Sequence, residues 1–278
     1  MYKNRGSGMF IQEKKIVLDI GLTKPYKLIH FSDVHVINLN DNENEEALNK
    51  AIKGEQAWLR VRKDFAIHFN EICEEEHMIP STKSLDNLLE YTNNVNPDLL
   101  VMTGDIIDYN SKANLSYLTS SLKNINYPYL ICVGNHESPS SIFDELTNNN
   151  SDFSYIDLDE FIVVSLNDSK KCFYQEQHDK LVELTKLNKP IIISFHIPIM
   201  TNLSKKEMEK FDQYFIINHD DCDEISKKMI DLFIENENIK AILCGHTHGY
   251  STSMFANNKY QYGVSSAIIG NLYNITIK

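Results

Sequence analysis

The sequence predicts a mixed α/β fold, and three observations support this class. Short apolar runs recur along the chain and end in polar or glycine-containing segments, as buried strands do when their C-terminal ends carry functional side chains. Helical patterns lie between these runs, and strands that alternate with helices indicate an α/β architecture. The segment 250–278 contains apolar runs without a helical pattern, which predicts a closing antiparallel β segment.

Each expected element follows from its local pattern. The apolar runs that we assign to strands, together with the polar residues that follow them, lie within 26–35, 98–108, 129–137, 161–168, 190–198 and 239–248. The segments with apolar residues at helical spacing, which we assign to helices, are 85–91, 115–122, 176–187 and 224–234.

One segment, from about residue 38 to residue 80, lies outside this alternation. Its apolar residues recur at helical spacing, which predicts an amphipathic helix or a helical pair interrupted near Gly54. The residues of the expected stripe are Leu48, Ile52, Trp58 or Leu59, Arg62, Phe65, Phe69 and Ile72. With 278 residues, 42% of them apolar, we expect a single domain over residues 1–278 that includes this helical insertion.

The composition restricts the class of protein. A formal net charge of −12 provides no general basic face, which argues against tight, sequence-independent binding to long nucleic acid. The 5 cysteines never have C-x-x-C spacing, so we expect reduced thiols rather than a disulfide framework or a thiolate zinc site. The chain shows neither the roughly 20-residue apolar stretch that spans a bilayer nor a secretory signal pattern, which predicts a soluble cytoplasmic protein.

Residues with metal-binding or acid–base side chains follow the expected strands. They are Asp33, His35, Asp105, Asn135, His136, His196, His246 and His248. Strand ends of an α/β sheet line the crevice where ligands bind, so these distant residues can converge. Each one alone has a plainer explanation as a helix cap, a turn residue or a core histidine, but together they favour one site. In the segment C-G-H-T-H-G, an extended backbone would point both histidines to the same side.

The residue types indicate the metal chemistry. Imidazole, carboxylate and one amide oxygen suit Mn, Fe, Zn or Co, and the lack of clustered thiolates argues against a purely structural zinc. Seven donors with one shared carboxylate predict two adjacent sites for two divalent or transition metal ions. Two divalent ions bring a charge of +4, whereas Asp33, Asp105 and a bridging hydroxide supply −3, so the site stays positive and can attract phosphate.

The motifs D-x-H, G-D-x-x-D, G-N-H-[DE], H and G-H-x-H occur in this order between Asp33 and His248. This series resembles that of the calcineurin-like metallophosphoesterases. The resemblance implies a four-layer β-sandwich flanked by helices, with the helical insertion after the first motif. It also implies a bridging role for Asp105 between two metals, one held by Asp33, His35, Asp105 and His248, and the other by Asp105, Asn135, His196 and His246.

The same resemblance assigns roles to residues outside the ligand set. It makes His136 the group that stabilises the phosphate and assists the leaving oxygen, which a histidine can do because it titrates near neutrality. Asp108 stands where relatives have a carboxylate partner for that histidine. Glu137 receives no chemistry beyond support of the ligands.

We therefore expect a metal-dependent phosphoric ester hydrolase in which metal-activated hydroxide attacks a small phosphorylated substrate. Tyr109 and Asn110 stand where phosphoprotein phosphatases of this superfamily have Arg-Gly, which slightly favours phosphodiesters. Cyclic-nucleotide and other small phosphodiesterases often have Asp where this chain has Glu137. The alternatives are a phosphomonoesterase and a catalytically silent metal-binding scaffold, whereas a nuclease needs a polyanion surface that the acidic composition does not indicate. We predict no particular oligomeric state.

The insertion 38–80 begins three residues after His35, so we expect it to cover the crevice and control substrate access. Arg60, Arg62 and Lys63 are candidates to contact the part of the substrate away from the scissile bond. A peripheral helix packed for stability is the alternative. The segment 201–221, which follows His196, is expected to form the opposite wall.

Overall fold

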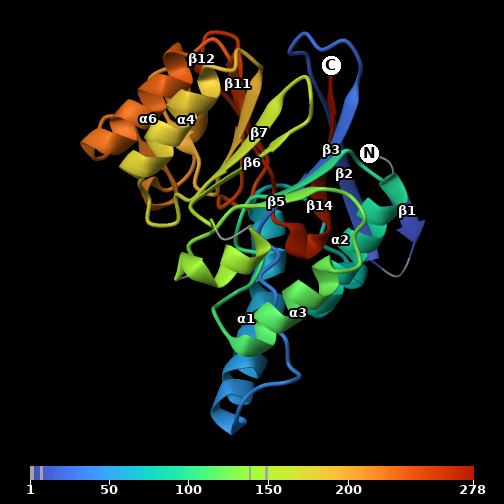
Figure 1. The fold of residues 1–278 in the computed structure, drawn as a ribbon. Helices are drawn as coiled ribbons and strands as arrows, with labels where there is room; N and C mark the ends of the chain where they lie inside the picture. The colour runs from blue at the N-terminus through green and yellow to red at the C-terminus, as the bar shows by residue number, and fades with distance from the viewer. Residues whose placement is uncertain (1–2, 7–8, 138, 148–149) are drawn as a thin grey trace.

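The structure, a computed structural model, describes residues 3–6, 9–137, 139–147 and 150–278. Two six-stranded sheets pack against each other, and helices cover the outer face of each sheet (Figure 1). The predicted α/β fold, with a β-sandwich flanked by helices, is therefore confirmed.

The first sheet has the strand order β1-β2-β14-β3-β4-β5. Its strands are β1 (Lys3–Gly6), β2 (Met9–Leu18), β3 (Tyr26–Phe31), β4 (Leu99–Met102), β5 (Tyr129–Ile131) and β14 (Asn271–Ile277). Strands β3, β4 and β5 run parallel to one another. Their C-terminal ends therefore meet at one edge of the sheet.

The second sheet has the strand order β12-β13-β11-β8-β7-β6. Its strands are β6 (Phe153–Asp157), β7 (Ile162–Leu166), β8 (Ile191–Ser194), β11 (Ile239–Cys244), β12 (Ser251–Ala256) and β13 (Lys259–Gly263). The four central strands are parallel, and β6 and β12 pair antiparallel at the edges. A separate parallel pair consists of β9 (Ile199–Met200) and β10 (Ile217–Asn218).

Three apolar layers hold the sandwich together. Residues from both sheets, among them Val101 of β4 and Val163 of β7, form the layer between the sheets. Helices α2 (Ser81–Val95) and α3 (Lys112–Leu122) cover the first sheet, while α4 (Gln175–Thr185) and α6 (Glu224–Glu235) cover the second. In α6 the buried residues Met229 and Phe233 are four positions apart, which places them on one helix face.

The segment 250–278 only partly follows its prediction. Strands β12 and β13 form the expected antiparallel pair, but β14 crosses to the first sheet and lies between β2 and β3. It runs parallel to β2, so the expectation of a purely antiparallel tail is wrong. Alternate residues of β14 enter different apolar layers, Leu272 the outer one and Tyr273 the layer between the sheets. A strand in the middle of the sheet can pack apolar side chains on both of its faces in this way, which explains why β14 does not form an edge hairpin.

The insertion forms one continuous helix, α1 (Glu45–His68), seen in blue at the bottom of Figure 1. Of the two alternatives, a single helix and a pair interrupted near Gly54, the structure has the single helix. A Cβ at Gly54 would lie 2.8 Å from the Ile37 side chain, so this glycine permits close packing instead. The buried face also differs from the expected stripe, because Ile52 and Phe65 are each 37% exposed. The buried residues of α1 are Ala51, Glu55, Arg62 and Ala66.

Arg62 holds the insertion together and cannot reach a substrate. Its side chain is buried, and Nη1 donates to the carbonyl oxygens of His77 at 2.6 Å and Ile79 at 2.8 Å. Glu55, whose Oε1 lies 3.7 Å from Arg62 Nη2, accepts hydrogen bonds from the backbone N–H and the hydroxyl of Ser81. The pair therefore fastens α1 to the start of α2, and the expectation of Arg62 as a substrate-binding cation is wrong.

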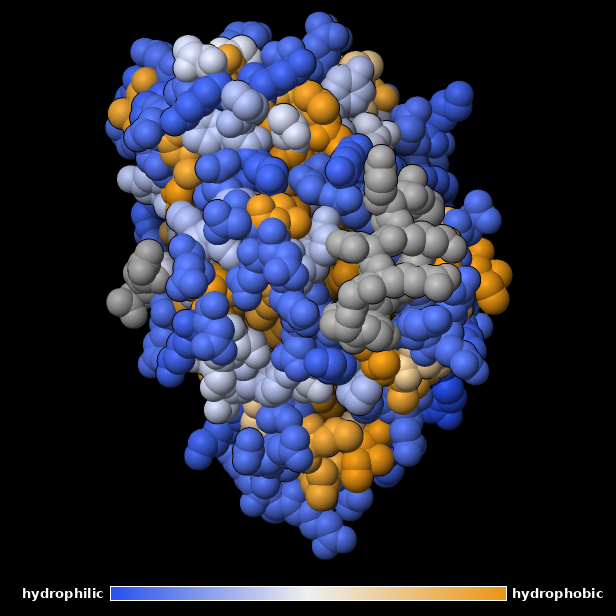
Figure 2. Space-filling model, turned by 90° about the vertical axis from the view of Figure 1, so that its right-hand side faces the viewer, coloured by the Kyte–Doolittle hydropathy of each residue, from blue (hydrophilic) through white to orange (hydrophobic). Residues whose placement is uncertain are grey.

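Short helical turns connect the remaining elements. They are η1 (Glu75–His77), η2 (Ser140–Leu146), α5 (Lys205–Met208), η3 (Gln213–Phe215) and η4 (Ala267–Ile269). The side of the molecule that carries β1 and β2 is mostly hydrophilic, with small separate hydrophobic areas (Figure 2). Within the described ranges, no helix has the length and apolar character needed to cross a membrane.

Candidate metal centre

All seven predicted metal ligands meet at the C-terminal ends of parallel strands. They come from loops that follow five strands, namely β3 (Asp33, His35), β4 (Asp105), β5 (Asn135), β8 (His196) and β11 (His246, His248). Since the first three strands belong to one sheet and the last two to the other, the centre lies where the two sheets meet at this edge. The sandwich thus joins residues that are far apart in the sequence.

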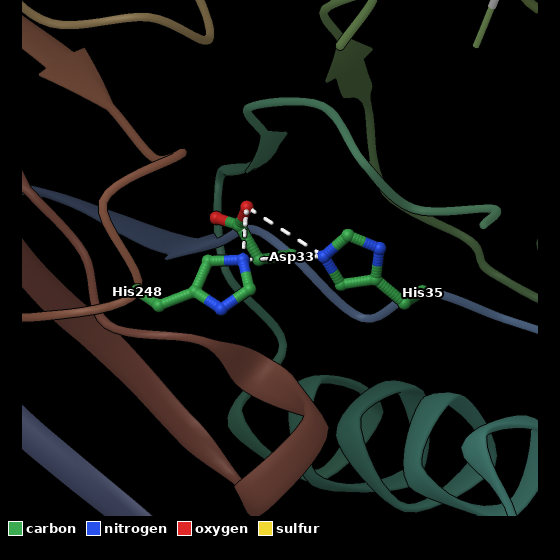
Figure 3. A group of neighbouring side chains, drawn as sticks. All are labelled: Asp33, His35 and His248. Atoms are coloured by element: carbon green, nitrogen blue, oxygen red, sulfur yellow. Dashed lines mark hydrogen bonds and ion pairs between the residues drawn. The ribbon is translucent and has the colours of Figure 1, made fainter. Parts of the chain in front are cut away.

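The first ligand group consists of Asp33, His35 and His248. One carboxylate oxygen of Asp33 lies 3.2 Å from Nε2 of His248 and 4.0 Å from Nε2 of His35. The two imidazole nitrogens are themselves 3.2 Å apart. Figure 3 shows both rings directed toward the Asp33 carboxylate. The three donor atoms therefore face a common point.

The second ligand group consists of Asp105, Asn135, His196 and His246. Nε2 of His196 lies 3.2 Å from Oδ2 of Asp105, 3.0 Å from Oδ1 of Asn135 and 3.0 Å from Nδ1 of His246. Oδ2 of Asp105 is also 4.0 Å from Nε2 of His35 in the first group. Asp105 therefore lies between the two groups, a position that is compatible with a bridging role.

The donor geometry fits metal binding. Two ligands at about 2.0–2.1 Å from a tetrahedral ion lie about 3.3 Å apart, close to the separations in both groups. Nδ1 of His196 donates to the carbonyl oxygen of Thr103 at 2.7 Å, which leaves the lone pair of Nε2 directed at the other ligands. Oδ1 of Asp33 is buried and forms no well-aligned hydrogen bond within the described part of the chain, although Nε2 of His248 lies 3.2 Å away. A cation would satisfy this oxygen.

Five of the seven predicted ligands adopt a left-handed backbone conformation. They are Asp33, His35, Asp105, His246 and His248, with φ between 49° and 66°. The idea that His246 and His248 share an extended backbone is therefore wrong, because β11 ends at Cys244 and each histidine turns to a different ligand group. Such conformations cost roughly 1–3 kcal/mol each and gather at functional sites.

Glycines allow the loops to approach one another closely. A Cβ at Gly134 would lie 2.2 Å from Oδ1 of Asp105, and one at Gly245 would lie 2.6 Å from Oδ2 of Asp33. These same oxygens accept backbone N–H bonds at 3.0 Å, from His136 and His246 respectively. Each carboxylate thus uses one oxygen to fix a neighbouring loop and directs the other into the centre.

His136 and Asp108 also meet at the centre. Nδ1 of His136 donates to the backbone carbonyl of Asp108 at 2.7 Å and lies 3.2 Å from its Oδ1. Nε2 lies on the opposite side of the ring and is 4.0 Å from Oδ2 of Asp105, and the side chain is 35% exposed. Burial lowers the pKa of His136, but its hydrogen bond to Asp108 and the charge of Asp105 outweigh burial and raise the pKa to about 9.

Trp58 of α1 covers the first ligand group, and the sequence patterns gave it no role at the centre. Its ring stacks on His35 with centroids 3.9 Å apart, and Nε1–H donates to Oδ1 of Asp108 at 2.8 Å. The same oxygen lies 3.3 Å from Nδ1 of His35. The insertion therefore reaches the centre through an aromatic ring and a hydrogen bond rather than through basic side chains.

The model of the family described as calcineurin-like phosphoesterase matches residues 26–250. The chain belongs to this family. The matched range covers every residue of both ligand groups. The resemblance that the motifs indicated is thus confirmed.

Individual relatives of this calcineurin-like chain are distant. It is 23% identical over 189 residues to "Probable glycerophosphodiester phosphodiesterase GpdQ" of Arcobacter nitrofigilis, covering 62% of this chain and 65% of that one. It is 24% identical over 195 residues to "Probable cyclic nucleotide phosphodiesterase" of Moraxella catarrhalis, with 62% and 66% coverage. The match thus spans slightly less than two thirds of each relative. The crystal structure of a dimetal phosphatase from Danio rerio has a similar fold, with a TM-score of 0.56, 12% identity and coverage of 87% and 88%.

Glu137 anchors two loops of the centre, which the sequence did not indicate beyond general support. Its buried carboxylate accepts hydrogen bonds from the N–H groups of Gly134, Asp105, Ile106 and Ile107, at 2.6 to 3.1 Å. Burial and the charge of Asp105 raise the pKa of Glu137 to about 8, whereas the N–H donors favour its charged form. Glu137 thus fixes the loop after β4 to the loop after β5.

Asp168 plays the same part for the loop after β8. Its buried carboxylate accepts from the N–H groups of His196 at 2.9 Å and Ile197 at 2.8 Å. Burial raises the pKa of Asp168 to about 7, and the charge of His196 acts in the opposite direction. Asp168 follows β7 just as the candidate ligands follow their strands. Its position after an apolar strand could therefore have predicted that it lies at the centre.

Proposed function

We propose that this protein hydrolyses a small phosphate ester at a centre of two divalent or transition metal ions, with a slight preference for phosphodiesters. The observation that carries this proposal is the convergence of two ligand groups on Asp105. Family membership supports the reaction class. The ligand roles of both groups and the role of His136 are part of the proposal.

When bound, the two ions supply the Lewis acidity that activates the attacking water and offsets charge on the phosphoryl oxygens. The chain fixes the geometry for this chemistry. Asp33 and Asp105 each direct one oxygen into the centre while their second oxygens hold backbone N–H groups. The single amide ligand, Asn135, adds no negative charge, which keeps the site attractive to phosphate.

His136 is the proposed acid that assists the leaving oxygen. Its Nδ1–H is fixed by the carbonyl of Asp108, so Nε2 is the atom that can donate to substrate. Asp108 acts as a positioning residue, because its carboxylate contacts His35, His136 and Trp58 and is only 14% exposed. The arrangement puts a partly exposed proton donor next to the ligand groups.

The preference for diesters rests on two observations. Tyr109 and Asn110 stand where protein phosphatases of the superfamily have Arg-Gly, and the names of both relatives include phosphodiesterase. A phosphomonoesterase is the second candidate, since the fold is shared with a dimetal phosphatase. A silent metal-binding scaffold on the same fold is the third.

Metal analysis and kinetics test the proposal together. Protein reconstituted with Mn²⁺ should hold two ions per chain and hydrolyse both 4-nitrophenyl phosphate and bis(4-nitrophenyl) phosphate. A higher kcat/KM for the diester supports our choice, and an advantage of about tenfold or more for the monoester reverses it. Two bound ions without turnover of either ester would identify a scaffold.

A further inference from the structure

A small cavity opens beside the second half of the G-H-T-H motif. It has a volume of about 200 Å³ and reaches His246, Thr247 and His248. The two histidines belong to different ligand groups, so the cavity borders both. A ligand bound at the proposed metal pair can therefore extend into it directly.

The cavity has aromatic walls on two sides. Phe65 of α1 and Phe69, the residue that follows α1, form one wall, and Phe211 and Phe215, from the segment that follows α5, form the other. The ring centroids of Phe65 and His248 are 4.7 Å apart, and those of Phe215 and His246 are 5.0 Å apart. The expectation that segment 201–221 forms a wall opposite the insertion agrees with these contacts.

Two of these rings, Phe65 and Phe215, leave part of their apolar surface in water. Phe65 is 37% exposed and Phe215 is 39% exposed, although burial of such a ring is favourable by about 1.5–3 kcal/mol. Phe69 and Phe211, with ring centroids 6.1 Å apart, connect the two walls. An apolar group held between the walls would remove this aromatic surface from water.

We propose that this cavity is a subsite for one apolar ring in the alcohol part of the ester. The subsite rests on the proposed function, because its occupant must be attached to the phosphate that the metal pair holds. Its volume suits a single ring, whereas a whole drug-sized ligand needs about 300–1,000 Å³. Trp58, which stacks on His35, does not line the cavity and so leaves it open to this ring.

A longer alcohol has room beyond the ring. Phe69, His68 and Lys210 line both this cavity and a neighbouring one of about 930 Å³. The larger cavity extends along β2, where Lys14 and Tyr250 line it. The ring subsite and the larger cavity are thus neighbours that share these three side chains.

Binding of non-hydrolysable phosphonates tests the subsite without turnover. Calorimetric titration of the Mn²⁺-loaded protein compares phenylphosphonate with methylphosphonate, which differ only in the group that enters the cavity. We expect the phenyl compound to bind roughly tenfold or more tightly, because it removes an aromatic face from water on both sides. Phe65→Ala and Phe215→Ala should each reduce this ratio by about threefold or more.

Ile67→Ala is the matched control, because Ile67 lies on the same helix two residues from Phe65, is 78% exposed and does not line the cavity. It should leave the ratio unchanged. Equal affinities in the wild type, a ratio unchanged in both phenylalanine variants, or no binding of either phosphonate overturns the subsite. Intact phenyl selectivity without hydrolysis of any aryl ester supports the subsite and overturns only the proposed function.

Discussion

His35 and His136 both turn Nδ1 toward the Asp108 carboxylate, at 3.3 Å and 3.2 Å, but their surroundings differ. The His35 side chain is 1% exposed beneath Trp58, whereas that of His136 is 35% exposed. Their ring centroids are 4.7 Å apart. One carboxylate thus orients two imidazoles, and the cover of α1 decides which of them a substrate can reach. The covered ring suits a metal ligand and the open ring suits an acid.

The largest expected effect comes from Asp105, which lies between the two ligand groups. Asp105→Asn removes the charge proposed to hold both ions, so metal content should fall below one ion per chain and turnover by at least about 100-fold. Elemental analysis after reconstitution with Mn²⁺ checks this outcome. Asp33→Asn serves as the control, because it should impair mainly the first ligand group. Two retained ions in Asp105→Asn would contradict the bridging role.

Substitution of each histidine tests directly whether the two have different roles. His136→Ala should keep both ions and lower kcat by roughly 100-fold or more, because it removes only the proposed acid. His35→Ala should instead lose an ion. His178→Ala, a change to a histidine of α4 outside the centre, should alter neither quantity. Loss of metal in His136→Ala, or full metal content in His35→Ala, would show that the two roles have been assigned the wrong way round.

A smaller effect is expected from substitution of Trp58, the residue that covers His35. Trp58→Phe keeps an aromatic ring over His35 but removes the N–H donor to Asp108, so kcat should fall by roughly tenfold. Thermal unfolding followed by circular dichroism should stay close to that of the wild type. Trp58→His, which can restore a donor, should recover part of the activity. An unchanged kcat in Trp58→Phe would leave Trp58 as a packing residue only.

The smallest expected effect is a change in fluorescence, which can be measured on the wild-type protein. Trp58 is the single tryptophan, and its ring stacks at 3.9 Å on a proposed metal ligand. Titration with Co²⁺ should therefore change its fluorescence in a saturable way. The response should disappear in His35→Ala and persist in His246→Ala, which belongs to the second ligand group. A constant emission on full metal loading would place no ion next to His35.

The sequence was sufficient to predict that the seven candidate ligands meet at one centre. Asp33, Asp105 and His196 each follow a short apolar strand, and parallel strands bring their C-terminal ends to one edge, so local pattern and topology agree. The role of Asp105 as a bridge came from the family resemblance. The distances around it are compatible with that role, which stays a prediction.

The surroundings of the centre could not be predicted in this way. The helical pattern of α1 placed both Arg62 and Phe65 on the packing stripe, but only Arg62 is buried, where Glu55 and two carbonyl oxygens satisfy it. Trp58 and Glu137 act through contacts with residues that are distant in the sequence. The spacing of apolar residues along the chain cannot predict such contacts. Strand β2 was also missed, since its polar residues 12–15 hide the alternation of a strand that lies inside the sheet.

The position of β14 has a consequence for how the protein folds during its synthesis. Residues 271–277 are translated after both ligand groups, yet β14 lies between β2 and β3. Ala267 and Ser266, also made late, bind the backbone at Ser32 and Asp33. Pairing between distant segments is slow, and unpaired strand edges are prone to aggregation. We therefore expect β2 and β3 to stay unjoined in the nascent chain until residues 271–277 have left the ribosome, and the proposed metal site to form only after that.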